Sequence, residues 1–499
     1  MESHLASEQP VVQEAAGDSA RASVEIGIVD TTLRDAHQSL WATRMTTAHM
    51  LPIAGMMDEI GFHRIDLIAA AQFDACVRYL KEDPWERIRL MCGAIVKTPL
   101  SSFLRSKNLV TFDFVPDDIV ELWVERLVAN GLREIGTFDG LNDVDNMMVA
   151  IDAGRRLGVK TFGALAYCLS PVHTDALYVD TARQLVERGR IDALWLKDAG
   201  GLLTVDRIRT LVPALKKVIG STPLELHSHC LTGVAPLVYL EGVKAGANSV
   251  HTSIAPLANG AAQPSTQSMI RNLRALGYRV DLNEDLIDKV GAHFRKIAEQ
   301  EGKPLGQVLE YDSFHYEHQI PGGMLSNFRS QLAEVGLSHK FQELLEECAK
   351  VRKELGYPIM ITPFAQFVGT QAVLNVMHGE RYRYVPDEVK KYALGYYGKL
   401  LAPVEPDVMD RIVGNGSAKI ALKAQPLQPA VAALRKKYPG ISDDERLLRF
   451  MFAGGHIVDD MKAAGPTKTE YTFEKPIVRL VRELADRRIA RVHFHHTNA

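Results

Sequence analysis

The sequence has few features that would link the chain to a membrane or to nucleic acid. No apolar run approaches the roughly 20 residues that span a bilayer, and the formal net charge is only -3 over 499 residues. Neither a bilayer nor a polyanionic partner is therefore expected. The first 24 residues also lack the basic start and apolar block of a signal peptide, so we expect residues 1–24 to form a flexible arm.

Cysteine is scarce, and its spacing does not suggest disulfides or a structural zinc site. The five cysteines form no C-x-x-C pair, which favours a reduced cytoplasmic protein with buried thiols. Glycine-rich phosphate-binding patterns are absent as well. No G-x-G-x-x-G or G-x-x-x-x-G-K follows an apolar strand, which argues against dinucleotide-binding and P-loop folds.

The first half of the chain has alternating short apolar runs and helical stretches, the pattern of a parallel sheet. Eight such units in about 230 residues favour an α/β fold, a closed (β/α)8 TIM barrel, over an open sheet. The chemistry of such barrels gathers at the carboxyl ends of the strands. The expected strands are residues 25–29, 64–69, 100–104, 133–138, 161–167, 193–196, 224–229 and 249–255.

The second half has longer helical patterns with charged faces, as in residues 284–301, 341–355 and 389–400. Two segments of unusual composition, 319–327 and 362–371, are expected to be loops that either contact substrate or cap helices. We predict a barrel domain at 25–283, a helical C-terminal domain at 284–402 and a variable extension at 403–499. The ending at 493–496 (HFHH) is expected to be a frayed tail.

Four side chains at strand ends are candidates for one metal site. His227 and His229 lie two residues apart, so in a strand both imidazoles face the same way. Asp35 follows the first strand, and Lys197 ends the sixth. An isolated H-x-H pair is more often satisfied by hydrogen bonds, but together these residues suit zinc, manganese or cobalt with open coordination positions. Cys230 should point away from the histidines.

Lys197 requires a separate explanation, because a protonated amine repels a dication. Burial lowers the pKa of a lysine and makes its amine nucleophilic. We hypothesise that CO2 carbamylates Lys197 and converts it into an anionic oxygen ligand. A metal held there would polarise a carbonyl oxygen and stabilise an enolate. Arg34 and Gln38 flank Asp35 and could bind an oxo acid, while Arg105 could clamp a carboxylate or form a surface ion pair.

Several ordered motifs resemble the carboxyltransferase domain shared by pyruvate carboxylase, the oxaloacetate decarboxylase α subunit and the transcarboxylase 5S subunit. The resemblance runs from about residue 30 to residue 399. The motifs are residues 33–40 (LRDAHQSL), 42–44 (ATR), 82–87 (EDPWER), 138–143 (FDGLND), 169–174 (LSPVHT), 196–198 (LKD), 227–229 (HSH) and 320–327 (IPGGMLSN).

The resemblance implies a barrel with a helical C-terminal domain in a homodimer or higher oligomer. It implies a metal held by Asp35, carbamylated Lys197, His227 and His229. It also implies carboxyl transfer between carboxybiotin and a 2-oxo acid such as pyruvate or oxaloacetate. Residues 461–462 (MK) lack the full A-M-K-M biotinylation motif, so biotin is expected on a separate carrier protein.

The chain departs from the family pattern at three places. Residues 261–265 read AAQPS where the family has T-S-Q-P-S, which removes a hydroxyl group. Gly136 replaces an arginine, and residues 68–74 (IAAAQFD) place methyl groups where the family has glycines. The metal and oxo-acid residues therefore match better than the rest of the pocket.

Three functions remain open from the sequence. The first is a carboxyltransferase like the 5S subunit that works with a biotin carrier. The second, favoured by Ala261, is a biotin-independent metal-dependent decarboxylase or carbon-carbon lyase. The third is an inactive scaffold subunit of a larger carboxylase, which the complete set of metal ligands disfavours.

Overall fold

The computed structural model describes residues 24–322, 324, 328, 332–333, 336–452, 456–473 and 476–486. Residues 1–23 of the predicted arm, part of the predicted loop at 319–327 and the 493–496 ending lie outside these residues. No helix in the described ranges is long and apolar enough to cross a membrane.

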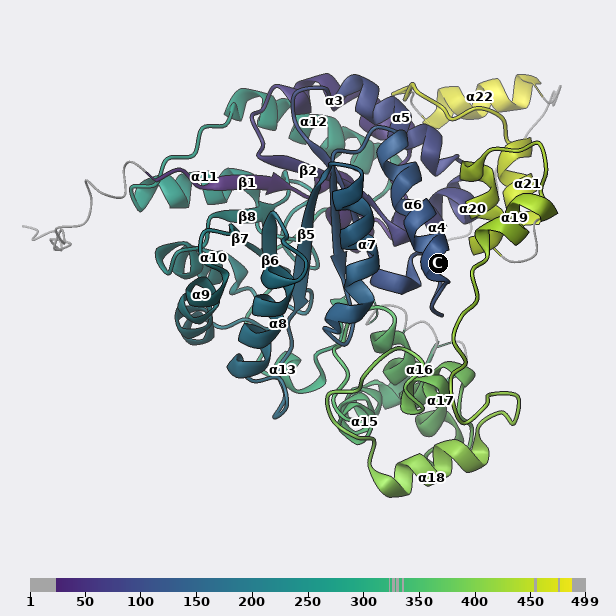
Figure 1. Cartoon of the computed structure of the whole chain (residues 1–499). Helices are drawn as coiled ribbons and strands as arrows, with labels where there is room; N and C mark the ends of the chain where they lie inside the picture. The colour runs from purple at the N-terminus through teal and green to yellow at the C-terminus, as the bar shows by residue number, and fades with distance from the viewer. Residues whose placement is uncertain are drawn as a thin grey trace, which may run out of the picture.

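Eight parallel strands close into a barrel in sequence order, with β1 pairing β8, which confirms the predicted TIM barrel (Figure 1). Almost every strand residue is buried, because side chains fill the barrel interior and helices cover its outside. The strands are β1 (Gly27–Asp30), β2 (Arg64–Ala69), β3 (Leu100–Leu104), β4 (Glu134–Phe138), β5 (Lys160–Ala166), β6 (Ala193–Asp198), β7 (Leu224–Ser228) and β8 (Ser249–Thr252).

Helices follow each strand and form the outer layer of the barrel. Many begin at a side-chain cap, as α9 does at Thr204 and α12 at Asn283. The described helices of this layer are α2 (His37–Leu40), α3 (Thr47–Asp58), α4 (Ala70–Ala75), α5 (Pro84–Ala94), α6 (Asp117–Ala129), α7 (Val144–Arg156), α8 (Asp175–Glu187), α9 (Val205–Ile219), α10 (Ala235–Lys244), α11 (Thr266–Ala275) and α12 (Glu284–Glu301). Short turns add η1 (Thr32–Ala36), η2 (Cys76–Leu80) and η3 (Ser106–Asn108).

The remaining helices build a second unit beside the barrel and then return to it. In Figure 1 the green helices α15 to α18 lie apart from the strands, whereas α19 to α21 lie beside α4 and α6. These helices are α13 (His315–His318), α15 (Phe341–Glu354), α16 (Phe364–His378), α17 (Asp387–Ala393), α18 (Pro406–Asn415), α19 (Val431–Lys437), α20 (Asp443–Met451), α21 (His456–Ala463) and α22 (Pro476–Asp486), with the turn η4 (Ser338–Lys340).

Two hydrophobic cores divide these elements. The smaller core joins α15, α16, α17 and α18 through residues such as Leu344, Val368 and Ile412. The larger core contains the barrel and also Phe294 of α12 and Leu448 of α20. We therefore propose that the helical unit begins after α12 rather than at residue 284, and that residues 430–463 belong with the barrel.

Two predicted elements differ from the structure. Residues 362–371 were expected to form a loop, but α16 covers Phe364–His378. Gly369 is tolerated within this helix because a β-carbon there would lie 2.4 Å from Phe328, so close packing requires glycine. The predicted helix at 389–400 is also too long. α17 ends at Ala393, because Gly395 and Gly398 adopt positive φ angles of 76° and 114°.

Candidate metal centre and active-site cavity

A single π-helical turn, η1, follows β1 and carries Arg34 and Asp35 to the mouth of the barrel. Such turns are rare and are frequently found at functional sites. All five residues of η1 are buried. Arg34 bridges Asp35, at 3.0 Å from Nη1 to Oδ2, and Asp66 of β2, at 2.6 Å from Nε to Oδ2. Because both partners are buried, this network fixes the direction in which Asp35 points.

The four predicted ligands meet at one point. Oδ2 of Asp35 lies 3.0 Å from Nε2 of His227, 3.4 Å from Nε2 of His229 and 3.7 Å from Nζ of Lys197. The two histidine Nε2 atoms are 3.4 Å apart. Asp35, His227 and His229 form the one group of potential metal ligands found among the described residues, and Cys230 is not part of it. β7 ends at Ser228, so His229 lies just past the strand.

This arrangement fits a divalent metal ion. Metal bonds of about 2.0–2.1 Å in a tetrahedral site place neighbouring ligand atoms about 3.3 Å apart. The measured separations of 3.0 and 3.4 Å between Asp35 Oδ2 and the two imidazole nitrogens bracket that value. Asp35 Oδ2 is buried and has no hydrogen-bond donor aligned with it. A carboxylate oxygen without a hydrogen bond therefore converges with two imidazole nitrogens, which have Lys197 Nζ and the amide of Gln263 beside them.

The charges around the ligands favour a deprotonated site. Burial opposes ionisation of Asp35, but the surrounding groups, with the charge of Arg34 the largest contribution, together outweigh it and hold the pKa of Asp35 well below its usual range. Burial, reinforced by the charge of Lys197, lowers the pKa of His227 well below 6.5. At neutral pH the site therefore presents a carboxylate and a neutral imidazole, the forms that bind metals.

Lys197 is buried at 5% exposure, and burial lowers the pKa of its amine to about 8 although Asp35 opposes this. Its Nζ lies 3.1 Å from Nε2 of His227 and 5.2 Å from the centre of the Phe103 ring. At pH 7 a pKa of about 8 leaves roughly a tenth of this amine unprotonated, which is the form that carbamylation requires.

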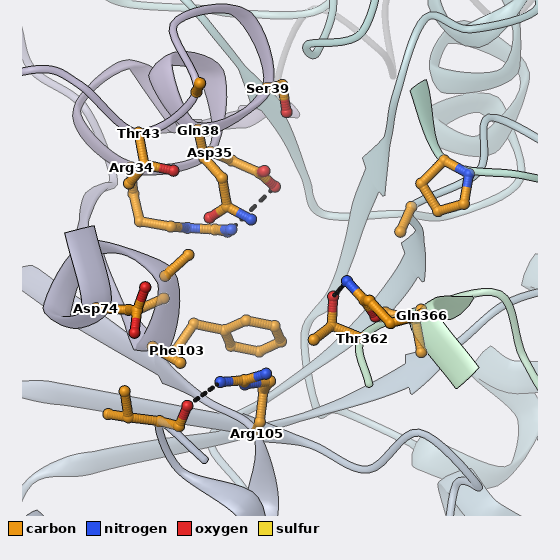
Figure 2. A pocket seen from close by; sticks show the side chains of 18 of the residues that line it. Arg34, Asp35, Gln38, Ser39, Thr43, Asp74, Phe103, Arg105, Thr362 and Gln366 are labelled. Carbon is orange, nitrogen blue, oxygen red and sulfur yellow. Dashed lines mark hydrogen bonds and ion pairs between the residues drawn. The ribbon is translucent and has the colours of Figure 1, made fainter. Parts of the chain in front are cut away.

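The cluster opens into a cavity of about 800 Å³, a size typical of small-molecule sites. Figure 2 shows Arg34, Asp35 and Gln38 along one side and Thr362 and Gln366 on the opposite side. Residues of both predicted loop segments line this cavity, including Pro321, Gly322 and Met324.

Arg105 lies on the cavity wall below Phe103 (Figure 2). Its guanidinium donates to the carbonyl oxygens of Leu109 at 3.0 Å and Val110 at 2.8 Å. It forms no salt bridge with any residue that the structure describes, so the surface ion-pair interpretation is wrong. Burial lowers its pKa to about 10, and the group remains cationic at neutral pH. A half-buried cation on a cavity wall, with no salt bridge to a described carboxylate, suits an anionic ligand.

Gln38 is held by a chain of amides at the base of the cavity. Its Oε1 accepts a hydrogen bond from Nε2 of Gln72 at 3.3 Å, and that same Nε2 donates to the carbonyl of Arg34 at 2.9 Å. Its own Nε2 has no hydrogen bond to a described protein group and remains free to donate to a ligand. Gln38 therefore lies beside Arg34 with a donor available.

Several residues of the site could not be identified from the sequence. Gln263 accepts a hydrogen bond from Thr31 through Oε1 at 2.8 Å, which turns its Nε2 toward His229 Nε2 at 3.1 Å. Met451 and Phe452 line the cavity although they lie more than 400 residues after Asp35. Asp139, another residue after a strand, is absent from the cavity lining and instead caps its own loop by accepting from the backbone of Leu141.

Two of the departures from the family pattern have structural explanations. The carbonyl of Ala261 accepts a hydrogen bond from Nδ1 of His229 at 2.6 Å, a contact that does not need the missing hydroxyl. A β-carbon on Gly136 would lie 1.7 Å from the ring of Phe162. Phe162 stacks on Trp195, with ring centres 4.4 Å apart, so an aromatic stack occupies the space beside Gly136.

Comparisons with known proteins identify relatives of this chain. Residues 316–456 match a family model described as conserved carboxylase domain. The chain is 45% identical over 407 residues to a pyruvate carboxylase subunit of Methanocaldococcus jannaschii, covering 81% of this chain and 71% of the relative. It is 34% identical over 458 residues to the methylmalonyl-CoA carboxyltransferase 5S subunit of Propionibacterium freudenreichii, covering 90% of each chain.

Solved structures give the same result. The carboxyl transfer domain of Rhizobium etli pyruvate carboxylase, solved with pyruvate, matches with a TM-score of 0.81 and 25% identity, covering 91% of this chain and 79% of that chain. The same domain solved with pyruvate and biocytin matches with a TM-score of 0.80 and 26% identity, covering 90% and 79%. The resemblance stated from the motifs is thereby confirmed.

Proposed function

Because the chain belongs to the carboxyltransferase family that includes the archaeal pyruvate carboxylase subunits and the transcarboxylase 5S subunit, we propose that it transfers a carboxyl group between carboxybiotin on a separate carrier and a 2-oxo acid. The chain is a carboxyltransferase, and the related domain from Rhizobium etli was solved with pyruvate and biocytin. The observation that carries the proposal is the convergence of Asp35, His227 and His229 at a cavity that also presents Arg34 and Arg105.

Asp35, His227, His229 and carbamylated Lys197 would hold the divalent ion, with zinc, manganese and cobalt as candidates. Bound there, the ion would polarise the ketone oxygen of the acid and stabilise the negative charge of its enolate. Within this site Arg34 orients Asp35 through a buried ion pair.

Carbamylation of Lys197 is supported by its burial and lowered pKa. The neutral Nζ attacks the carbon of CO2, a carbon-nitrogen bond forms, and one proton leaves to solvent. The product carries an oxygen anion beside His227, which removes the charge repulsion between an ammonium group and a dication. An intact-mass excess equal to one CO2, absent from Lys197→Ala, is the expected result. A Lys197→Ala protein with full metal content would contradict this role.

The two arginines and Gln38 have different tasks in this proposal. Arg34 is committed to Asp35 and Asp66, whereas Arg105 has no carboxylate partner among the described residues. We therefore assign the substrate carboxylate to Arg105, with Arg34 and the free amide of Gln38 near the oxo acid. The 800 Å³ cavity is larger than a small 2-oxo acid needs and leaves room for a second reactant.

Partners and location follow from the same proposal. A biotinylated carrier protein supplies the second reactant, and a homodimer or higher homo-oligomer is the proposed assembly. The five cysteines form no disulfides, and the thiols suit the reducing cytoplasm.

Oxaloacetate decarboxylation by the purified full chain tests the function, with and without free biotin and with Asp35→Asn as the control. We expect a rate that biotin increases several-fold and that Asp35→Asn abolishes. A fast rate that is unaffected by biotin would contradict carboxyl transfer and support the biotin-independent lyase, which the relatives do not favour. Absence of any rate together with an empty metal site would support the scaffold alternative.

A further inference from the structure

His227 makes a second contact, deeper in the barrel, on the side of its ring away from Asp35. Its Nδ1 lies 3.0 Å from Nδ1 of His251 on β8. β7 and β8 pair in parallel, with Leu226 opposite Val250, so the following residues His227 and His251 are neighbours in the barrel interior. Both imidazoles have 0% exposure, so water cannot mediate or replace this contact.

His251 is in turn tied to a buried carboxylate. Its Nε2 lies 3.0 Å from Oε2 of Glu225, two residues before His227 on the same face of β7. Glu225 also forms a buried ion pair with Arg64, which contacts Glu134 at 2.9 Å as well. Arg64 therefore keeps Glu225 ionised. An ionised carboxylate only accepts hydrogen bonds, so Nε2 of His251 must donate.

The positions of the protons on both rings follow from this anchor. A neutral imidazole carries one proton, so a His251 protonated at Nε2 has a lone pair at Nδ1. That lone pair can only be satisfied if Nδ1 of His227 donates to it. His227 is then protonated at Nδ1, and its Nε2 lone pair points at Asp35 Oδ2, 3.0 Å away.

We infer that Glu225 and His251 are positioning residues that fix the proton of His227 on Nδ1 and so keep its Nε2 available to the metal. His229 reaches the same state differently, because its Nδ1 donates to the backbone carbonyl of Ala261. The two histidines thus donate to different acceptors. His227 donates to His251, which is linked to the carboxylate of Glu225, whereas His229 donates to a neutral peptide carbonyl. Acceptors of this kind orient metal-bound histidines and raise their basicity.

The packing around His251 supports a fixed orientation. Its ring stands at 84° to Trp195 with ring centres 4.2 Å apart, and Arg64 lies 5.1 Å from the same indole. A ring flip of His251 would place carbon atoms against Glu225 and His227, and both buried groups would lose their partner. This inference rests on the metal site proposed above. The experiments are therefore chosen so that a failure of the inference and a failure of the metal site give different results.

The test combines metal affinity with the tautomer observed by NMR. Zn²⁺ affinity is measured by chelator competition for the full chain, His251→Leu, His251→Asn and His293→Asn. The last is a matched control on α12, where the histidine contacts the backbone carbonyl of His49. We expect His251→Leu to weaken Zn²⁺ binding about 10- to 100-fold. Asn at 251 offers an oxygen near the Nδ1 position and should restore affinity to within about threefold, and the control should not change it.

A double-mutant comparison tests whether Glu225 acts through His251. Glu225→Gln should weaken Zn²⁺ binding in the wild-type background and have no further effect in His251→Leu. Equal losses in both backgrounds would mean that Glu225 affects the metal by another route. Unchanged affinity in a folded His251→Leu protein would overturn the inference.

The metal-free wild type gives an independent readout that needs no variant. In ¹⁵N-histidine NMR, His227 should show a protonated Nδ1 and His251 a protonated Nε2, with the signals assigned from the variants. The opposite tautomers would overturn the inference whether or not the protein binds Zn²⁺. Conversely, a wild type with the expected tautomers and no Zn²⁺ affinity would contradict the proposed metal site. It would still support the proposed positions of the protons on His227 and His251.

Discussion

Arg105 is the residue that we propose binds the carboxylate of the substrate. It is held by two backbone carbonyls, and no described acidic residue forms a salt bridge with it. We predict that Arg105→Gln lowers kcat/KM for the 2-oxo acid about 10- to 100-fold, mainly through KM. A hydrogen bond to a charged group contributes about 1.5–3 kcal/mol, which corresponds to that range.

Steady-state kinetics with oxaloacetate measure this effect. Arg183→Gln is the control, because Arg183 lies on α8 with 43% of its side chain exposed and forms a surface ion pair with Asp180. If Arg105→Gln has the same KM as the control, Arg105 does not bind the substrate carboxylate.

Gly136 shows how one residue can change the barrel interior. A β-carbon at this position would lie 1.7 Å from Phe162, so the ring fits in its present position only if residue 136 is glycine. We predict that Gly136→Ala destabilises the protein by about 2 kcal/mol or more, because overpacking forces side chains from their preferred rotamers. Urea unfolding provides the measurement.

The matched control for this prediction is Gly55→Ala in α3, where the added carbon would meet no side chain or backbone beyond its own helical turn within 4 Å. That change should be neutral or stabilising by up to about 1 kcal/mol. In a Phe162→Ala background, Gly136→Ala should lower the free energy of unfolding much less. An equal cost in both backgrounds would show that Phe162 is not the reason for the glycine.

At the scale of elements, β2, β4 and β7 are linked by the buried ion pairs of Arg64 with Glu134 and Glu225. Burial opposes ionisation of Glu225, but Arg64 and His251 lower its pKa from 4.5 to about 2. A carboxyl whose pKa is lowered on folding stabilises the protein above its unfolded pKa, and this contribution disappears as the pH falls through the folded pKa. The relevant window is therefore between about 4.5 and about 2.

We predict that the difference in unfolding free energy between wild type and Glu225→Gln amounts to a few kcal/mol at about pH 6. It should shrink as the pH is lowered below about 4.5, because the wild-type carboxylate becomes protonated. Urea titrations across this range measure it. A difference that stays constant down to about pH 3 would show that the Glu225 charge does not stabilise these strands.

The sequence predicts elements best where the pattern is local. The eight strands and α12 were predictable from hydrophobic periodicity and capping. The convergence of Asp35, Lys197, His227 and His229 was predictable from their place at strand ends. α16 was missed, because Pro363 and Gly369 suggest a loop and only the contact with Phe328 explains the glycine. His251 and Glu225 were missed for a related reason: their roles depend on neighbours across strands, which one sequence does not reveal.

At the scale of the whole molecule, the C-terminal extension contributes Met451 and Phe452 to the wall of the cavity. Asp444 anchors α20 to the barrel by accepting hydrogen bonds from Arg126 at 2.7 Å and Asn130 at 3.2 Å. This anchor holds Phe452, 1% exposed, at the cavity wall with its ring 5.2 Å from the guanidinium of Arg78. The sequence did not predict this contact. Residues 403–499 are far from the barrel strands along the chain and gave no indication that part of the extension lines the cavity.

We predict that Phe452→Ala enlarges the cavity and lowers kcat/KM for the 2-oxo acid about tenfold, a loss comparable with removing part of a hydrophobic pocket. Bound metal should be unchanged, because Phe452 does not belong to the ligand cluster. Kinetics and metal analysis on the same preparation, with thermal unfolding to confirm folding, separate these effects. Wild-type kinetics in a folded variant would show that the extension only closes the surface.

The central claim is that Asp35, Lys197, His227 and His229 hold one divalent ion. Metal analysis by mass spectrometry of the purified full chain, beside Asp35→Asn and His229→Ala, tests it most directly. We predict close to one equivalent of zinc, manganese or cobalt per wild-type chain and much less in both variants, with their folds intact. Wild-type metal content in both variants, or no metal in an active wild type, would contradict the account.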